Sequence, residues 1–545
     1  MGKEKRNGQA FIGVKKGNLF LFISLALMAI SLTLSPFMMG ASQFFLVASW
    51  LFTGDPIKVK FQRFIHNRVA LVIVALYLLH LVGLVYTSDF AYAFKDLRVK
   101  LPLLILPMVL SSVKPLSKKY FDLLMLLYVA SVFIATCISF GTYVRHNYGD
   151  IREISRFISH IRFCLNIVLS IGIIGFYIFK QRISKGKSVP AFSLKTALNQ
   201  FLMWFLLLWF VYQIYIFESL SGYLAFAGII IATLLYVYFT KVRSTTWKVI
   251  GLAVVVAVPI AAGLILYHTV SRLLEVKPVN IETLDKTTAL GNDYWHDTVC
   301  FPVEDGKYIG LYFCRPEMRE AWNHRSELDY DGLTLNGENL EATLARYLTS
   351  KDLRKDAIGV NTLEEQDIRN VENGVANYNN LVHPGLHARL SETAFEYNQY
   401  RRYNNPNGGS LSQRIEYTRA SFHLIQKHPI FGVGTGDIPE AYRQAYDELH
   451  SPLEEQYRHR AHNQYLSITV GFGIIGLIIF LVTLLYPYCS SKRHRSYLYT
   501  IFLVIALLSM LPEDTIETQA GATWFALFNS LLIFATEKGK ESPEK

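Results

Sequence analysis

Long apolar runs separated by short polar loops dominate the pattern of this chain. Several runs reach the roughly 18–20 residues that an α-helix needs to cross a bilayer. Because an open sheet cannot satisfy its backbone hydrogen bonds in lipid, the pattern predicts an all-α polytopic membrane protein. We predict about twelve transmembrane helices from these runs, at residues 18–37, 39–53, 69–86, 101–113, 120–143, 161–179, 199–217, 219–240, 248–268, 464–487, 496–512 and 521–536. The first run is longer than the apolar part of a signal peptide, and we interpret it as an uncleaved span.

One long hydrophilic block, Thr269–Ala461, interrupts this series after the ninth predicted span. Its patterns indicate mostly helices, for example Leu340–Ser350 and Thr362–Tyr378, and its length suits a small domain. We therefore expect three regions, which are a membrane domain at 1–268, a loop domain at 269–463, and a second membrane domain with a tail at 464–545.

Basic residues gather in the loops on one side of the predicted helices. The chain has 54 Lys and Arg against 43 Asp and Glu, a net charge of +11. The loops after the second, fourth, sixth, eighth and tenth spans are basic and share a side with the basic N-terminus. The positive-inside rule makes that side the cytoplasm, so both termini are predicted there and the loop domain on the outer face. Since this rule explains much of the charge, we do not expect nucleic acid as a partner.

Five cysteines are present, and two of them, Cys300 and Cys314, share the loop domain. They could form a disulfide if this domain faces an oxidising compartment, and two free thiols are the alternative. No Cys and His spacing typical of a metal site occurs, so no metal is expected.

Two predicted outer loops carry positive charge against the general rule. Residues 94–101 include Arg98, and residues 145–165 include His146, His160 and four arginines, which are Arg145, Arg152, Arg156 and Arg162. Arginine offers a bidentate fork for phosphate. Together with Arg414, Arg458 and Arg460, these loops indicate a site for an anionic ligand at the outer membrane face. For any single arginine, a snorkelling side chain or a lipid-phosphate anchor is the simpler interpretation.

The stretch Ser410–Phe480 brings polar groups directly before a predicted span. It begins with a predicted helix, Leu411–Lys427, that Pro429 ends. The spacing puts Arg414, Thr418 and Ser421 on one face, and we expect Ile415, Phe422 and Ile425 to pack away from it.

A glycine-rich turn, Gly432–Asp437, follows this helix. Gly434 and Gly436 could let backbone N–H groups converge on an anion, and Asp437 could cap the next helix. A tight turn between two helices is the simpler interpretation of the same residues.

His462 lies at the N-terminal end of the predicted span 464–487, beside Arg458 and Arg460. The helix dipole and these cations disfavour a charged imidazole, and a neutral imidazole can take a proton from a hydroxyl group. Asn463 could orient the histidine or a substrate. A histidine that only caps the span is the alternative.

An acidic cluster precedes the last predicted span. Glu513, Asp514 and Glu517 lie on the predicted outer side. They could pair with the outer arginines, although a solvated loop is the simpler interpretation.

Several segments together resemble the O-antigen ligase and polymerase superfamily. Two segments resemble the signature region of this superfamily, which are RIEYTRASFHLIQKHPIFGVGTGD and, one helix later, HNQYLSITVGFGIIGL. GLVYTSDFAYAFKDLRVKLPLLILP, HIRFCL and LPEDTIETQAGATWFALF are similar to Bacteroidetes variants of this family. One departure is Glu218-Ser-Leu-Ser-Gly222, where many relatives carry an arginine.

The resemblance implies a GT-C-like glycosyltransferase of the bacterial inner membrane with a large, mostly helical periplasmic loop. Its donor would be a glycan on undecaprenyl pyrophosphate, and its acceptor would be lipid A–core or another periplasmic glycan acceptor. The resemblance also implies contact with membrane lipids and no metal or other cofactor. The family's histidine base maps onto His462, and its pyrophosphate-binding arginines onto Arg162 and Arg414, with Arg98 as a further candidate. We also expect substrate contacts from a second group, which is His160, Asn463, Gly434, Gly436 and Asp437.

Three other functions share some of these features. A polysaccharide polymerase and a protein O-oligosaccharyltransferase would use the same groups with another acceptor. A transporter is the alternative outside the enzymes, although the chain shows neither an internal repeat nor charges in the middle of its spans.

Overall fold

The computed structural model describes residues 16–52, 55–145, 151–185, 194–241, 244–490 and 495–535. Nearly all regular structure in these residues is helical, which confirms a helical membrane protein. The one sheet among them pairs two short antiparallel strands, β1 (Val303–Glu304) and β2 (Lys307–Tyr308). The predicted cytoplasmic termini and His146 fall outside the described residues.

The helices that precede the loop domain are α1 (Lys16–Leu34), α2 (Pro36–Phe52), α3 (Ile57–Ile65), α4 (Arg68–Val82), η1 (Gly83–Tyr86), α5 (Phe90–Lys100), α6 (Pro102–Ser112), α7 (Lys118–Arg145), η2 (Ile151–Ile154), α8 (His160–Lys185), α9 (Leu194–Phe217), α10 (Leu220–Lys241) and α11 (Thr245–Leu274). The later helices are η3 (Ile281–Thr283), α12 (Arg315–Asn323), α13 (Leu340–Ser350), α14 (Ala357–Asn361), α15 (Glu365–Glu372), α16 (Tyr378–Val382), α17 (Leu386–Tyr403), α18 (Ser410–Lys427), α19 (Ile438–Glu448), η4 (Glu455–Tyr457), α20 (Gln464–Ser490), α21 (Tyr497–Ser509), η6 (Thr515–Glu517) and α22 (Gln519–Phe534).

Six helical segments in the described part of the chain are long and apolar enough to cross a membrane, or seven if α2 and α3 form one broken span. They are Arg68–Tyr86, Lys118–Arg145, His160–Phe179, Leu198–Phe217, Leu220–Thr240 and Gln464–Ser490. Shorter apolar helices occur at Leu19–Leu34, Ile260–Leu274, Tyr497–Ser509 and Gln519–Phe534. The larger predicted number of spans therefore stays a prediction.

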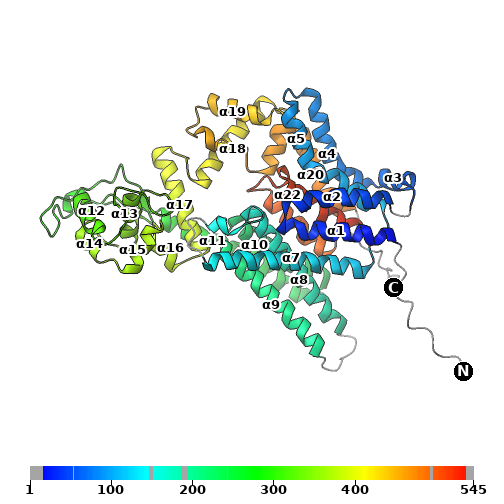
Figure 1. The fold of residues 1–545 in the computed structure, drawn as a ribbon, viewed down its shortest axis with the longest axis horizontal. Helices are drawn as coiled ribbons and strands as arrows, with labels where there is room; N and C mark the ends of the chain where they lie inside the picture. The colour runs from blue at the N-terminus through cyan, green and yellow to red at the C-terminus, as the bar shows by residue number, and fades with distance from the viewer. Residues whose placement is uncertain are drawn as a thin grey trace.

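The last apolar helices pack among those of the N-terminal half. In Figure 1, the orange α20 lies beside α4, and the red α22 lies beside α1 and α2 at the blue end of the chain. Tyr128 of α7 illustrates the contact, because its ring meets Phe528 of α22 with centroids 4.8 Å apart. One hydrophobic core thus joins segments that the loop domain separates in sequence.

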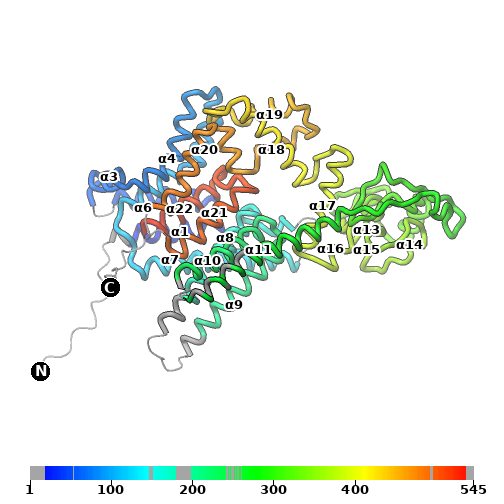
Figure 2. The backbone as a smooth tube through the Cα atoms, turned by 180° about the vertical axis from the view of Figure 1, so that it is seen from behind, coloured from blue at the N-terminus to red at the C-terminus, as the bar shows by residue number. Residues whose placement is uncertain are grey.

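The hydrophilic block folds into two clusters. Residues between 309 and 371 enclose their own core, with Trp322, Tyr330 and Tyr347 fully buried, and Figure 2 shows this part beyond α17, away from the membrane helices. The second cluster contains α18 and α19 and packs on Val470 of α20. The boundaries 268/269 and 463/464 remain predictions.

Three local expectations for this block can be compared with the structure. Leu340–Ser350 is confirmed as α13, but the helix predicted over Thr362–Tyr378 is wrong in length. There α15 ends at Glu372, because Asn373 and Gly374 form a turn in which Gly374 has φ +81°. Cys300 is exposed and Cys314 is buried, and both are free thiols.

Helix α18 forms as predicted and stops at Lys427 before Pro429. The expected packing face is wrong in one respect, because Phe422 is 54% exposed. The helix instead turns Tyr417, Ser421 and Leu424 toward α19 and α20. Ser421 shares a hydrogen bond of 2.7 Å with the Tyr442 hydroxyl.

Candidate functional site

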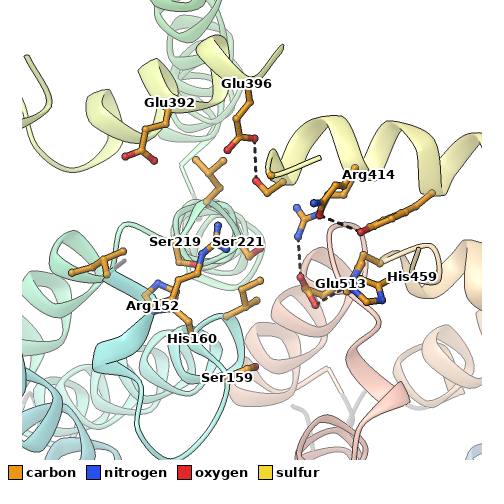
Figure 3. Close-up of a pocket in the computed structure, with 18 of the residues that line it drawn as sticks. Arg152, Ser159, His160, Ser219, Ser221, Glu392, Glu396, Arg414, His459 and Glu513 are labelled. Atoms are coloured by element: carbon orange, nitrogen blue, oxygen red, sulfur yellow. Dashed lines mark hydrogen bonds and ion pairs between the residues drawn. The ribbon is translucent and has the colours of Figure 1, made fainter. Parts of the chain in front are cut away.

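Residues from the membrane helices and from the loop domain line a cavity of about 1750 Å³. Its membrane side is formed by α5, the starts of α8 and α10, and the turn between α21 and α22. Its other side is formed by α13, α17, α18 and α19. Figure 3 shows Glu392 and Glu396 of α17 across the cavity from Ser159 and His160.

His462 lines this cavity and lies two residues before the start of α20. Its backbone is left-handed, with φ +47°, and its side chain is 34% exposed. The Nδ1 atom lies 3.8 Å from Oε2 of Glu513, and the ring centroid lies 5.4 Å from that of Tyr417. The imidazole therefore sits beside a carboxylate and an aromatic wall while remaining accessible from the cavity.

Glu513 links the two residues that the sequence singled out most strongly. Its Oε1 atom accepts a hydrogen bond of 2.9 Å from Arg414 of α18, as Figure 3 shows, while Oε2 faces His462. Only 13% of the Glu513 side chain is exposed. The interpretation of this acidic cluster as a solvated loop is therefore wrong for Glu513, which pairs with Arg414, one of the arginines expected as partners.

The other two acids of the cluster are buried below the cavity. Glu517 pairs with Lys100 of α5 and with Arg460, each at 2.6 Å, and accepts a hydrogen bond from Gln464 at 2.9 Å. Despite burial, Lys100 and Arg460 hold the pKa of Glu517 well below its usual range. Three segments, which are α5, the residues before α20 and the α21–α22 turn, are thereby fastened together.

Asp514 has a different environment from Glu517. Its Oδ1 accepts a hydrogen bond of 2.6 Å from Ser467, and its Oδ2 is buried without a hydrogen-bond partner. Burial raises the pKa of Asp514, although the charge of Arg460 opposes this.

Arg162 stands at the first turn of α8, on the wall of the cavity. One Nη1 hydrogen bond of 2.9 Å reaches Ser159, and the Nε atom is buried without a partner. Among the residues that the structure describes, no carboxylate lies within ion-pair distance of it, whereas Arg414, Arg458 and Arg460 all have one. Arg162 thus retains donors that a ligand in the cavity could use.

The remaining cavity residues near Arg162 have structural partners. His160 lines the cavity, but its ring nitrogens contact the Ser155 hydroxyl at 3.2 Å and the Phe217 carbonyl at 2.5 Å. Glu218 also lines the cavity. It accepts a hydrogen bond of 2.7 Å from the Gly385 N–H, which ties the start of α10 to α17.

Two other expected contacts lie outside the cavity lining. Arg98 is exposed on α5, and Lys95 of the same helix lines the cavity in its place. Asn463 caps α20, because its Oδ1 accepts a hydrogen bond of 3.1 Å from the Leu466 N–H.

The glycine-rich turn docks onto other parts of the chain. The N–H of Gly434 donates to the Gly471 carbonyl at 2.9 Å, and the N–H of Gly436 donates to Thr87 at 2.7 Å. A Cβ atom at Gly436 would lie 2.1 Å from the Asp89 carbonyl oxygen. These amides are already bonded within the protein, which favours the tight-turn interpretation over an anion site.

Asp437 does not cap the helix that follows it, so that expectation is wrong. Its carboxylate instead accepts hydrogen bonds from the Ser88 N–H and hydroxyl and from the Asp89 N–H, at 2.8–3.0 Å. Although burial opposes it, these bonds keep the pKa of Asp437 below its usual value. Asp437 therefore holds the glycine turn against the residues that begin α5.

The sequence did not single out the amide side chains on the loop side of the cavity. Asn336, Asn373, Asn377 and Asn380 all line it. Asn373 lies in the turn after α15, Asn377 caps α16, Asn380 belongs to α16, and Asn336 lies before α13. The sequence signal for the turn was the Asn373-Gly374 pair inside a segment predicted to be helical.

Comparison with known families gives one match, and comparison with curated proteins gives none. Residues 374–481 match the family model described as O-antigen ligase. This range holds α17, α18, the glycine turn and His462, and it supplies much of the cavity wall. This part of the chain is thus similar to the O-antigen ligase family, which confirms the resemblance to the O-antigen ligase and polymerase superfamily.

Proposed function

We propose that this chain is an O-antigen ligase-type glycosyltransferase. It would move a glycan from undecaprenyl pyrophosphate to lipid A–core or another periplasmic acceptor at the outer face of the inner membrane. The main support is that His462, Glu513, Arg414 and Arg162, from four distant segments, meet around one cavity next to the membrane helices.

In this proposal His462 is the general base. It takes the proton of the acceptor hydroxyl while that oxygen attacks the anomeric carbon, and the bond to the pyrophosphate oxygen breaks with its electron pair. The Glu513 carboxylate beside Nδ1 stabilises the imidazolium that forms and favours Nε2 as the accepting atom.

The leaving pyrophosphate develops negative charge, which arginines can stabilise in a site that excludes bulk water. Arg162 is best suited to this role because its Nε is unpartnered and no carboxylate of the described residues lies within ion-pair distance of it. Arg414 contributes positive charge from the opposite wall while it also positions Glu513.

Replacing His462 by asparagine tests this function. Asparagine tolerates the left-handed backbone at this position but cannot act as a base near neutral pH. We expect transfer to fall by about 10²–10⁴-fold, while the protein still inserts and purifies normally. The measurement is the conversion of lipid-linked glycan to glycan-capped acceptor in membranes.

His423→Asn is the matched control, because His423 pairs with Glu448 outside the cavity lining. Wild-type transfer in the His462 variant would refute the proposal. Lipopolysaccharide gels of a deletion strain then separate the alternatives: loss of the whole ladder with accumulated lipid-linked glycan indicates a ligase, and a single-repeat band indicates a polymerase.

A further inference from the structure

Part of the cavity is built by residues that precede the O-antigen ligase match. Asn336, Arg346 of α13 and Asn373 line the cavity, whereas the family match begins at residue 374. Arg346 lies in α13, within the part of the loop domain that has its own buried core. Asn373 follows α15 at the border of that part. This chain therefore extends its cavity with a wall that lies partly outside the matched range, and Asn380 and Arg389 of the matched range complete it.

The cations of this wall are already neutralised. Arg346 makes a bidentate pair with Glu304 at 2.8 Å, and its guanidinium lies 4.2 Å from the centre of the Phe395 ring. Arg389 pairs with Glu392 at 2.7 Å. Neither arginine is left for a phosphate, in contrast to Arg162 on the membrane side.

Three amides of the wall keep hydrogen-bonding capacity. The Oδ1 atom of Asn380 is buried and has no partner. Asn373 donates through Nδ2 to the Arg369 carbonyl at 2.6 Å, which leaves its side-chain oxygen available. Asn336 accepts from Thr334 through Oδ1, which leaves its NH₂ group available.

Such a set offers donors and acceptors without net charge. A sugar hydroxyl both donates and accepts, so neighbouring hydroxyls match amide side chains well. A phosphate or a carboxylate would need the cations that this wall has already paired.

We propose that this amide wall, Asn336, Asn373 and Asn380, binds uncharged sugars of the glycan substrate beyond the sugar that reacts. The inference rests on the proposed function for its place in the reaction. The wall would then select the glycan, while Arg162 and His462 act on its reactive end. The same hydroxyl chemistry occurs in the donor glycan and in the acceptor glycan.

The test uses the full chain in detergent and measures binding without transfer. The probes are the oligosaccharide released from the lipid-linked donor and, separately, the oligosaccharide released from the acceptor. Saturation-transfer NMR follows each probe with wild type and with the triple variant Asn336→Ala, Asn373→Ala, Asn380→Ala. Asn361→Ala is the matched control, because Asn361 is exposed on α14 outside the cavity lining.

We expect the triple variant to bind one of the two oligosaccharides about tenfold more weakly, the effect of losing one or two net hydrogen bonds. Asn361→Ala should bind it as wild type does, and the affected probe identifies donor or acceptor. Equal binding by wild type and the triple variant, or no binding of either probe, would overturn the inference. Retained binding by a wild-type protein that transfers no glycan would instead overturn the proposed function alone.

Discussion

Single residues in this cavity take their roles from their neighbours. Glu513 lies between Arg414 and His462, so one carboxylate positions an arginine and accompanies a histidine. Arg162 and Arg98 were both expected to hold phosphate, yet their surroundings differ. Arg162 faces the cavity with an unpartnered Nε, whereas Arg98 is exposed and lies outside the lining.

This difference predicts opposite outcomes for the same substitution. Arg162→Lys keeps the charge but loses the fork, and we expect the KM for the lipid-linked donor to rise about ten- to hundredfold. Arg98→Lys should leave the donor KM unchanged. Steady-state transfer with varied donor checks both, and an unchanged KM in Arg162→Lys would exclude this arginine from the donor site.

Among the elements, the turn between α21 and α22 organises the site most directly. It supplies Glu513 to the cavity and fastens α5 and the residues before α20 through Glu517. Its two buried acids have pKa shifts of opposite sign. The pKa of Glu517 is lowered by its cations against the effect of burial, and that of Asp514 is raised by burial.

These signs predict opposite stability effects at neutral pH. Glu517→Gln leaves Lys100 and Arg460 without their shared anion and should cost about 3–5 kcal/mol. Asp514→Asn removes a carboxyl group whose ionisation burial disfavours and should raise the melting temperature. Thermal unfolding in detergent measures both variants, and a shift in the same direction for the two would contradict this account.

The pH dependence follows from the same shifts. The folded pKa of Glu517 lies below its ordinary value of 4.5, so its stabilisation is present above pH 4.5 and is lost as the pH falls toward the folded value. The folded pKa of Asp514 lies above its ordinary value of 3.8. Its contribution to the free energy of unfolding is therefore lost as the pH rises from 3.8 through the folded pKa. Glu517→Gln should therefore flatten the loss of stability below pH 4.5.

At the scale of the whole molecule, the cavity lies where the membrane helices meet the loop domain. Figures 1 and 2 both show α17 joining these two parts. If the positive-inside prediction is correct, the loop domain and the cavity face outward and the end of α20 faces the cytoplasm. Two exposed free cysteines lie on these two sides, Cys300 and Cys489.

Thiol labelling tests this orientation. A membrane-impermeant maleimide should label Cys300 in intact spheroplasts and Cys489 only after permeabilisation. The Asp297 carboxylate accepts a hydrogen bond from the Cys300 thiol and raises the pKa of that thiol, so labelling at a pH of about 8.5 provides more thiolate. The variants Cys300→Ser and Cys489→Ser identify which cysteine is labelled. Labelling of Cys489 in intact spheroplasts would contradict the predicted topology.

The sequence by itself determined the helical membrane class, the helix α18 with its end before Pro429, and the family resemblance through the segment that includes His462. These properties are local, because apolar run length, proline and motif spacing act within one stretch of chain. Several unconfirmed spans correspond to apolar helical segments of only 10–17 residues in the described part of the chain, which is shorter than a full crossing.

Only the tertiary structure decided which polar groups meet. Arg414 and Glu513 are 99 residues apart in sequence, and Asp437 contacts residues about 350 positions earlier. Packing of α20 and the α21–α22 turn against the N-terminal helices creates these contacts, and no local pattern encodes them. In the folded chain, Glu513 and Glu517 pair with Arg414 and Arg460, and the glycine turn packs on Thr87 and Gly471. The amide wall and Arg162 line the same cavity.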